Sequence, residues 1–120
     1  MARRLWARES AGLKLGVQLT DSADRPVDIT GWTLACSFAR QRGVNLLTLG
    51  MAASAAAQGF WPIAPAEGRY QVTILPASLQ AIPDETGDFT MFGDVIATLP
   101  GGARLWIEDW ELQVTEGPTA

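Results

Sequence analysis

Histidine is absent from this sequence of 120 residues, and cysteine occurs once. Histidine is the side chain that most often acts as a general base or as a transition-metal ligand, so both kinds of site lose their commonest residue. A single cysteine, Cys36, excludes an internal disulfide and a thiolate-ligated zinc or iron–sulfur site within one chain. Cys36 alternates with Trp32, Leu34 and Phe38. This pattern predicts a small buried core residue rather than a reactive thiol.

Long apolar runs are also missing. No stretch approaches the ~18 apolar residues that a membrane-spanning helix needs. Arg8, Glu9 and Lys14 interrupt the basic start before an apolar segment of signal-peptide length develops, so no secretory signal is predicted and folding in a cytoplasm is expected. The content of 48% hydrophobic and 18% charged residues is typical of a globular chain, and 120 residues correspond to about one domain.

Charge is distributed unevenly along the chain. Residues 1–60 hold seven basic and four acidic side chains, a balance of +3, whereas residues 61–120 hold two and nine, a balance of −7. The two halves either attract one another between subunits or form two solvated faces of one domain. Because the arginines are scattered and the net charge is −4, nucleic-acid binding is not expected.

Alternation of apolar and polar residues predicts most of the chain to be strands. The Pro100-Gly101-Gly102 turn makes the last two strands a long hairpin, and the strand before them is expected to be their antiparallel neighbour. Pro62 lacks an N–H, which favours an edge position for its strand. The alanine-rich residues 50–58 are interpreted as a loose connection or a weak edge strand. The predicted strands are residues 13–19, 32–39, 44–49, 60–63, 69–75, 88–99 and 106–115.

The fold class that follows is all-β: an antiparallel, Greek-key-like β-sandwich of about seven strands, with one short helical turn near 76–82 that Pro76 begins. Residues 1–12 are predicted to be an N-terminal arm, 13–117 a single sandwich domain and 118–120 a C-terminal tail.

The last strand is irregular. Leu105 and Ile107 have one parity, whereas Trp106 and Trp110 have the other. Either a bulge near residues 108–109 switches the buried side, or the strand is covered on both faces.

Acidic side chains supply no convincing catalytic or metal site. Asp21, Asp24 and Asp28 lack the spacing of a calcium loop and are interpreted as turn-forming residues. Glu108 and Asp109 are adjacent on a strand and point to opposite faces, so an acidic strand facing solvent or a subunit is favoured over a pair of catalytic carboxylates. No serine lies in a nucleophile elbow and no glycine-rich loop opens a helix. We therefore predict no enzyme activity, no catalytic residue, no metal and no cofactor.

Five tryptophans are the unusual surplus of this chain. Trp32 and Trp110 are predicted to be core residues, and Trp6 and Trp61 to contact a partner. The alternatives are a carbohydrate-binding module that uses Trp61 and Trp106, and an inhibitor or immunity-type protein that uses its acidic half. The predicted interface consists of Arg3, Arg4, Trp6, Arg8, Trp61, Trp106, Glu108 and Asp109.

The order of short motifs resembles small β-sandwich modules of tailed bacteriophages. Residues 25–32 read Arg-Pro-Val-Asp-Ile-Thr-Gly-Trp, residues 68–74 read Gly-Arg-Tyr-Gln-Val-Thr-Ile, and residues 87–95 read Gly-Asp-Phe-Thr-Met-Phe-Gly-Asp-Val. A crossing segment, 77–83, and a closing hairpin, 100–115, complete the order. The resemblance is to the amino-terminal domain of upper baseplate proteins and related tail and fibre-attachment proteins. The residues that match its motifs are Pro26, Asp28, Thr30, Gly31, Phe89, Phe92, Asp94, Val114 and Thr115.

This resemblance implies a virion structural protein, assembled in a bacterial cytoplasm, that links tail, baseplate or fibre components in several copies. Its partners would be other virion proteins and copies of itself, with no nucleic acid or membrane, and with a glycan only under the carbohydrate-binding alternative. The alanine-rich 50–58 has no counterpart in such modules. No long receptor-binding region follows Thr115, so an adaptor, fibre-network or capsid-decoration role is expected in place of host-receptor binding.

Overall fold

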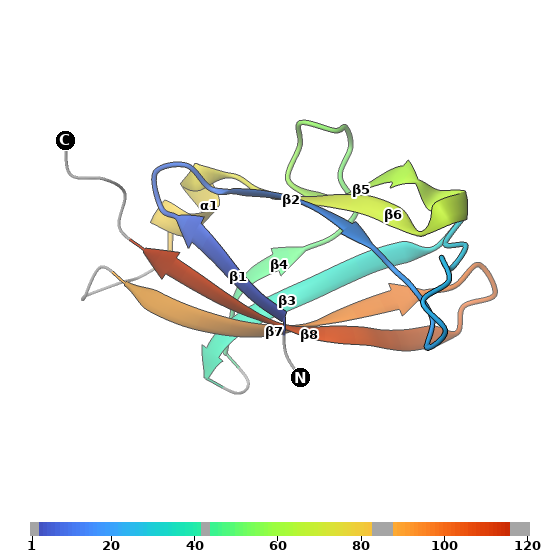
Figure 1. The fold of residues 1–120 in the computed structure, drawn as a ribbon. Helices are drawn as coiled ribbons and strands as arrows, with labels where there is room; N and C mark the ends of the chain where they lie inside the picture. The colour runs from blue at the N-terminus through green and yellow to red at the C-terminus, as the bar shows by residue number, and fades with distance from the viewer. Residues whose placement is uncertain (1–2, 42–43, 83–87, 116–120) are drawn as a thin grey trace.

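Two β-sheets packed face to face make up the computed structural model, which describes residues 3–41, 44–82 and 88–115 (Figure 1). Within these ranges no helix is long and apolar enough to cross a membrane. A 3-10 turn, η1 (Pro65–Glu67), and one helix, α1 (Pro76–Gln80), accompany the strands. The strands are β1 (Arg3–Arg8), β2 (Leu13–Gln18), β3 (Thr33–Gln41), β4 (Val44–Leu49), β5 (Gly59–Ala64), β6 (Arg69–Ile74), β7 (Phe89–Thr98) and β8 (Arg104–Thr115).

The larger sheet has the order β1-β8-β7-β3-β4 and the smaller one β2-β6-β5. The all-β sandwich is thus confirmed, with eight strands described instead of about seven. The chain changes sheets between β1 and β2, β2 and β3, β4 and β5, and β6 and β7. One sheet contains β2, β6 and β5, and the opposite sheet contains β3, β7 and β8. Immunoglobulin-like sandwiches have the same arrangement of strands. The prediction that β6 neighbours β7 is wrong, because β6 lies in the other sheet, whereas the β7–β8 hairpin is confirmed.

Several local predictions are confirmed. The helical turn begins at Pro76, and β5, which contains Pro62, lies at an edge of the smaller sheet. The alanine-rich 50–58 forms no helix. It connects β4 to β5 and has no strand of its own, which fits a loose connection. A β-bridge joins Met51 to Phe60, and the Gln71 side chain donates to the Ala55 carbonyl oxygen at 2.8 Å. Alanine alone does not stabilise so short a helix without an apolar stripe to bury.

The N-terminal segment differs from the predicted arm. Residues Arg3–Arg8 form β1, which runs parallel to β8 from the pair Arg3 and Trp110 to the pair Arg8 and Thr115. Leu5 and Ala7 are buried in the core, while Arg4, Trp6 and Arg8 point outward. An alternating pattern is therefore present, but three arginines within six residues obscure it, which favoured the interpretation as a mobile or partner-docked arm. The predicted tail, 118–120, and residues 116–117 lie outside the described ranges.

The bulge in the last strand is confirmed. Val95 lies opposite Glu108, whereas Ile96, the next residue, lies opposite Trp106, so Ile107 has no partner in the β7–β8 register. The extra residue switches the inward parity of β8 by one. As a result Leu105 is on the same side of the sheet as Trp110.

Aromatic rings from both sheets meet at the centre of the core. Trp110 of β8 is 1% exposed, and its ring centroid lies 6.4 Å from that of Phe38 and 5.8 Å from that of Phe60. Phe60 in turn contacts Tyr70 at 5.8 Å. Trp110 and Phe38 belong to the larger sheet and Phe60 and Tyr70 to the smaller one, so these rings join the two layers.

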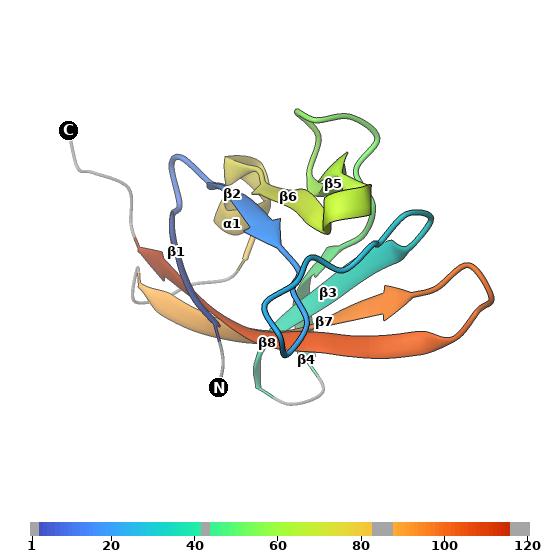
Figure 2. The same cartoon turned by 45° about the vertical axis from the view of Figure 1, so that its right-hand side comes forward.

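Other core predictions are confirmed as well. Cys36 is buried, and that burial raises the pKa of its thiol to about 12, which keeps the thiol protonated and unreactive at neutral pH. Trp32 is half-buried and packs against the core. Leu79 of α1 is fully buried at one end of the sandwich, and the β7–β8 turn lies at the other end (Figure 2).

Candidate interaction surface

The outward side of the larger sheet carries an exposed aromatic surface. Trp6 is 61% exposed, Phe92 is 52% exposed and Trp106 is 56% exposed. All three rings project from the side of the sheet that faces away from the core. The residues on either side of Trp6 and Phe92 are buried, and Trp106 lies opposite Ile96, whose own neighbours in β7 are buried. We call this surface the outer face. It comprises Arg4, Trp6, Arg8, Ala35, Ser37, Thr90, Phe92, Asp94, Ile96, Trp106, Asp109, Glu111 and Gln113.

Strand register sets the neighbours on the outer face. Glu111 of β8 lies between Arg4 of β1 and Phe92 of β7 in one row across the sheet. The Arg4 guanidinium approaches the Glu111 carboxylate at 3.1 Å. Trp6 is next to Gln113, and its indole N–H donates to the Gln113 side-chain oxygen at 3.1 Å. The hydrogen bond to Gln113 holds the Trp6 ring on the sheet, and the ring remains exposed to solvent.

Arg3 and Glu108, two of the predicted interface residues, lie at the edge of the core instead. Arg3 Nε donates to Glu108 Oε1 at 2.7 Å, and the indole N–H of the buried Trp110 donates to the same carboxylate. The hydrogen bond to Glu108 raises the pKa of Arg3. With the pair Arg4–Glu111, this bridge joins the basic first half of the chain to its acidic second half within one molecule.

Two carboxylates face each other on the outer face. Asp94 of β7 and Asp109 of β8 are directly opposite in the register. A hydrogen bond between the two carboxyl groups raises the pKa of Asp94, with burial and the Asp109 charge as smaller causes. The same hydrogen bond lowers the pKa of Asp109, helped by the Trp106 indole N–H, which donates to Asp109 Oδ1 at 3.1 Å. We call these two residues the acid pair.

We expect Asp94→Asn to stabilise the protein at pH 7 by about 0.5 kcal/mol, because like charges directly opposite on a sheet repel. Folding raises the pKa of Asp94. Asp94 therefore stabilises the folded protein at pH values below the pKa of the unfolded state, and this stabilisation is lost as the pH rises through the pKa of the folded state. The gain from Asp94→Asn should therefore vanish near pH 3, where Asp94 is already protonated. Thermal unfolding of dilute protein at both pH values measures this.

Glu67→Gln is the matched control for that experiment. It removes the same charge at an exposed site, where the Glu67 carboxylate lies 3.9 Å from the Arg69 guanidinium. We expect no stabilisation from it at either pH. A lower melting temperature for Asp94→Asn at pH 7 would contradict repulsion within the acid pair.

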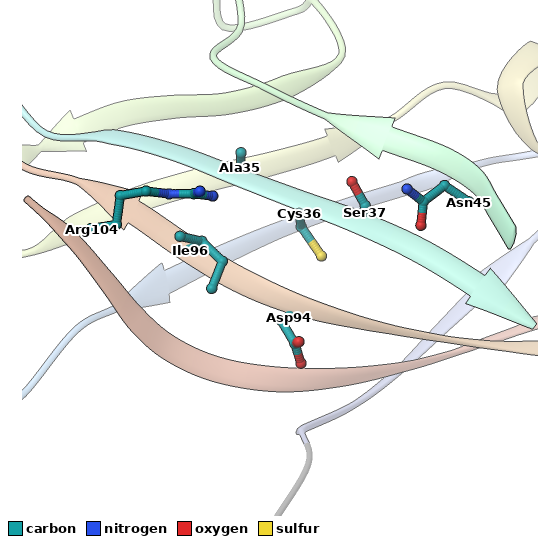
Figure 3. A pocket seen from close by; sticks show the side chains of 7 residues that line it. All are labelled: Ala35, Cys36, Ser37, Asn45, Asp94, Ile96 and Arg104. Atoms are coloured by element: carbon teal, nitrogen blue, oxygen red, sulfur yellow. The ribbon is translucent and has the colours of Figure 1, made fainter. Parts of the chain in front are cut away.

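An open depression adjoins the acid pair (Figure 3). Its volume is about 280 Å³, and its floor is formed by the small residues Ala35 and Ser37 of β3. Arg104 and Asn45 lie at opposite ends of it, and Asp94 lies along one side. The lining carries both charge signs and is open to solvent, so it suits a protruding side chain of a partner better than an enclosed small molecule.

The predicted interface residues thus divide into separate groups. Arg4, Trp6, Arg8, Trp106 and Asp109 share the outer face. Trp61 lies in β5 of the smaller sheet, half-buried and opposite Gln71, so it shares no surface with Trp106.

Sequence reasoning left Phe92 and Asp94 out of the interface. The alternation in residues 88–99 indicates their position, because it places Phe92 and Ile96, and with them Asp94, on the side opposite the core.

The remaining acidic candidates form turns, as predicted. Asp21 Oδ1 accepts hydrogen bonds from the backbone N–H groups of Ala23 at 2.9 Å and Arg25 at 3.0 Å. Asp28 Oδ1 accepts one from the Thr30 N–H at 2.9 Å. Among residues 3–41, 44–82 and 88–115, no group of three or more His, Cys, Asp or Glu side chains is placed to hold a metal ion.

No protein-family model matches this chain, and a search of curated proteins gives no match to it.

Proposed function

We propose that this chain is a non-enzymatic structural protein of a tailed-bacteriophage virion. It is an adaptor of the tail, the baseplate or a fibre attachment that assembles in several copies. The observation that carries the assembly role is the outer face, where Trp6, Phe92 and Trp106 are each more than half exposed on a rigid sheet. Aromatic residues are enriched at protein–protein contacts, so three exposed rings on one face of a sheet favour a contact there. The virion assignment rests on the motif order in residues 25–32, 68–74 and 87–115.

The mechanism is that of a rigid spacer. Two packed sheets with aromatic rings from both layers in the core resist bending, so contacts at the surface stay at fixed distances from one another. The outer face supplies one contact through aromatic rings and charges. The free edges of β1 and β4 supply unpaired backbone groups, which favour strand addition by a partner.

The carbohydrate-binding alternative has less support than assembly. Trp61 and Trp106, its two candidates, lie on different sheets and cannot form one platform. On the outer face itself, Phe92 and Ile96, the residue opposite Trp106, are four residues apart in β7. This corresponds to roughly 13 Å along a strand. The rings are therefore isolated rather than a continuous row for stacking sugars.

Immunogold labelling tests the proposal. Antibody raised against the purified chain should label the tail or tail tip of particles induced from the strain that encodes it. Label on capsids would replace the tail role with capsid decoration. Complete particles that carry no label would overturn the virion assignment, and specific binding of the purified chain on a glycan array would then favour the carbohydrate-binding alternative.

A further inference from the structure

We infer that the outer face is the contact between two copies of this chain, related by a two-fold axis. The inference rests on the proposed assembly function, because it specifies which surface one copy presents to the next. The argument comes from charge: Arg8 and the acid pair are too far apart to neutralise each other within a single chain.

The basic site is Arg8, at the end of β1. Arg8 is exposed and forms no ion pair with any residue in the described ranges, whereas Arg3 and Arg4 are paired with Glu108 and Glu111. Its register partner in β8 is Thr115. Arg8 is therefore a solvated cation on the outer face, where Arg4 is already paired with Glu111.

The acidic site is the acid pair. Asp109 precedes Thr115 by six residues on β8, so Arg8 and the acid pair lie roughly 20 Å apart along the sheet. This distance exceeds the Debye length of about 8–10 Å at physiological salt, which leaves them without useful attraction in one chain. Asp94 and Asp109 instead repel each other, and a cation supplied from outside would relieve that repulsion.

A two-fold contact brings both sites together at once. In such an interface each patch meets its own counterpart in reverse, so Arg8 of one copy faces the acid pair of the other, and the reciprocal contact forms at the same time. Trp6 and Phe92 occupy the intervening surface, two residues from Arg8 and from Asp94 respectively. The centre of the contact then holds two aromatic rings beside the ion pair of Arg4 and Glu111, and a charged contact forms at each end.

The size of the surface fits this contact. Strands β1, β8, β7 and β3 are adjacent in the larger sheet. Four strands about 4.8 Å apart and eight residues long span roughly 20 by 26 Å, or about 500 Å² in projection. Side chains roughen that plane, so its accessible area approaches the ~800 Å² per partner of a standard interface.

Charge reversal with mixing tests the inference. Wild-type protein should sediment as a dimer at micromolar concentration, and added salt should weaken the dimer. Arg8→Glu should raise the dimer dissociation constant at least ~10-fold, and so should the acid-site variant Asp94→Lys/Asp109→Asn, because each alone creates two repulsive contacts. An equimolar mixture of the two variants should regain the dimer. In the mixed dimer the new glutamate of one variant meets the new lysine of the other, while the unchanged Arg8 meets the unchanged Asp94 at the opposite end.

Lys14→Glu is the matched control, because it reverses an exposed charge on the outward side of the smaller sheet. It should leave the dimer unchanged, and circular dichroism should show every variant folded. A wild-type monomer at ~100 µM, equal weakening by Lys14→Glu, or a mixture no tighter than its components would each overturn the inference. Labelled virions together with a monomeric chain would refute this contact alone, whereas a dimer together with unlabelled virions would refute the proposed function alone.

Discussion

Replacing Trp110 with alanine is expected to lower the free energy of unfolding by about 4 kcal/mol. The side chain is 1% exposed and its ring contacts both Phe38 of its own sheet and Phe60 of the opposite sheet. Its removal opens a cavity where the two layers join. It also removes one hydrogen-bond donor from the Glu108 carboxylate, which keeps the hydrogen bond from Arg3. Urea unfolding followed by far-ultraviolet circular dichroism gives the free energy directly.

Trp106 provides the control for Trp110, because it has the same side chain in the same strand on the opposite side of the bulge. It is 56% exposed, so Trp106→Ala should change the free energy of unfolding by less than about 0.5 kcal/mol. Trp110→Phe should fall between these values, since phenylalanine keeps most of the buried area but donates no hydrogen bond. Equal losses for Trp106→Ala and Trp110→Ala would mean that the bulge does not divide β8 into an exposed and a buried part.

Local patterns were enough to predict the strands but not their neighbours. The edge position of β5 followed from Pro62, and the bulge followed from the change of parity between Leu105 and Trp110, because both are properties of one segment. The pairing of β1 with β8 joins the two ends of the chain. No short pattern encodes such a partner, which is selected by long-range burial of residues such as Leu5.

For the candidate surface, too, properties of one strand can be predicted from the sequence, whereas contacts between strands cannot. Alternation alone places Phe92 and Ile96 outward, so the aromatic character of the outer face is open to prediction. The acid pair is not, because the position of Asp94 opposite Asp109 depends on a register between two strands that the bulge at Ile107 shifts by one. Side chains that face each other across strands become visible only once this register is known.

Gly93→Ala is expected to destabilise the protein by about 2 kcal/mol, within the range that overpacking of a close-packed core produces. Gly93 lies between Phe38 of β3 and Trp110 of β8 in one row across the larger sheet. Because glycine leaves a gap in that row, the two rings lean toward each other and stack with centroids 6.4 Å apart. A Cβ atom at this position would lie 2.8 Å from both Cys36 Sγ and the Ser37 carbonyl oxygen, and 3.0 Å from Phe38 Cδ1.

The cost of that methyl group depends on whether its neighbours can move away. The Ser37 oxygen belongs to the backbone of the adjacent strand and Phe38 is fully buried, so neither can move away without shifting β3.

Gly16 of β2 is the matched control, because a Cβ atom there meets nothing within 4 Å. Gly16→Ala should be neutral or stabilising by about 0.5 kcal/mol. Thermal and urea unfolding of both variants decide the question: a Gly93→Ala protein as stable as Gly16→Ala would show that the Phe38 and Trp110 rings do not close over this position.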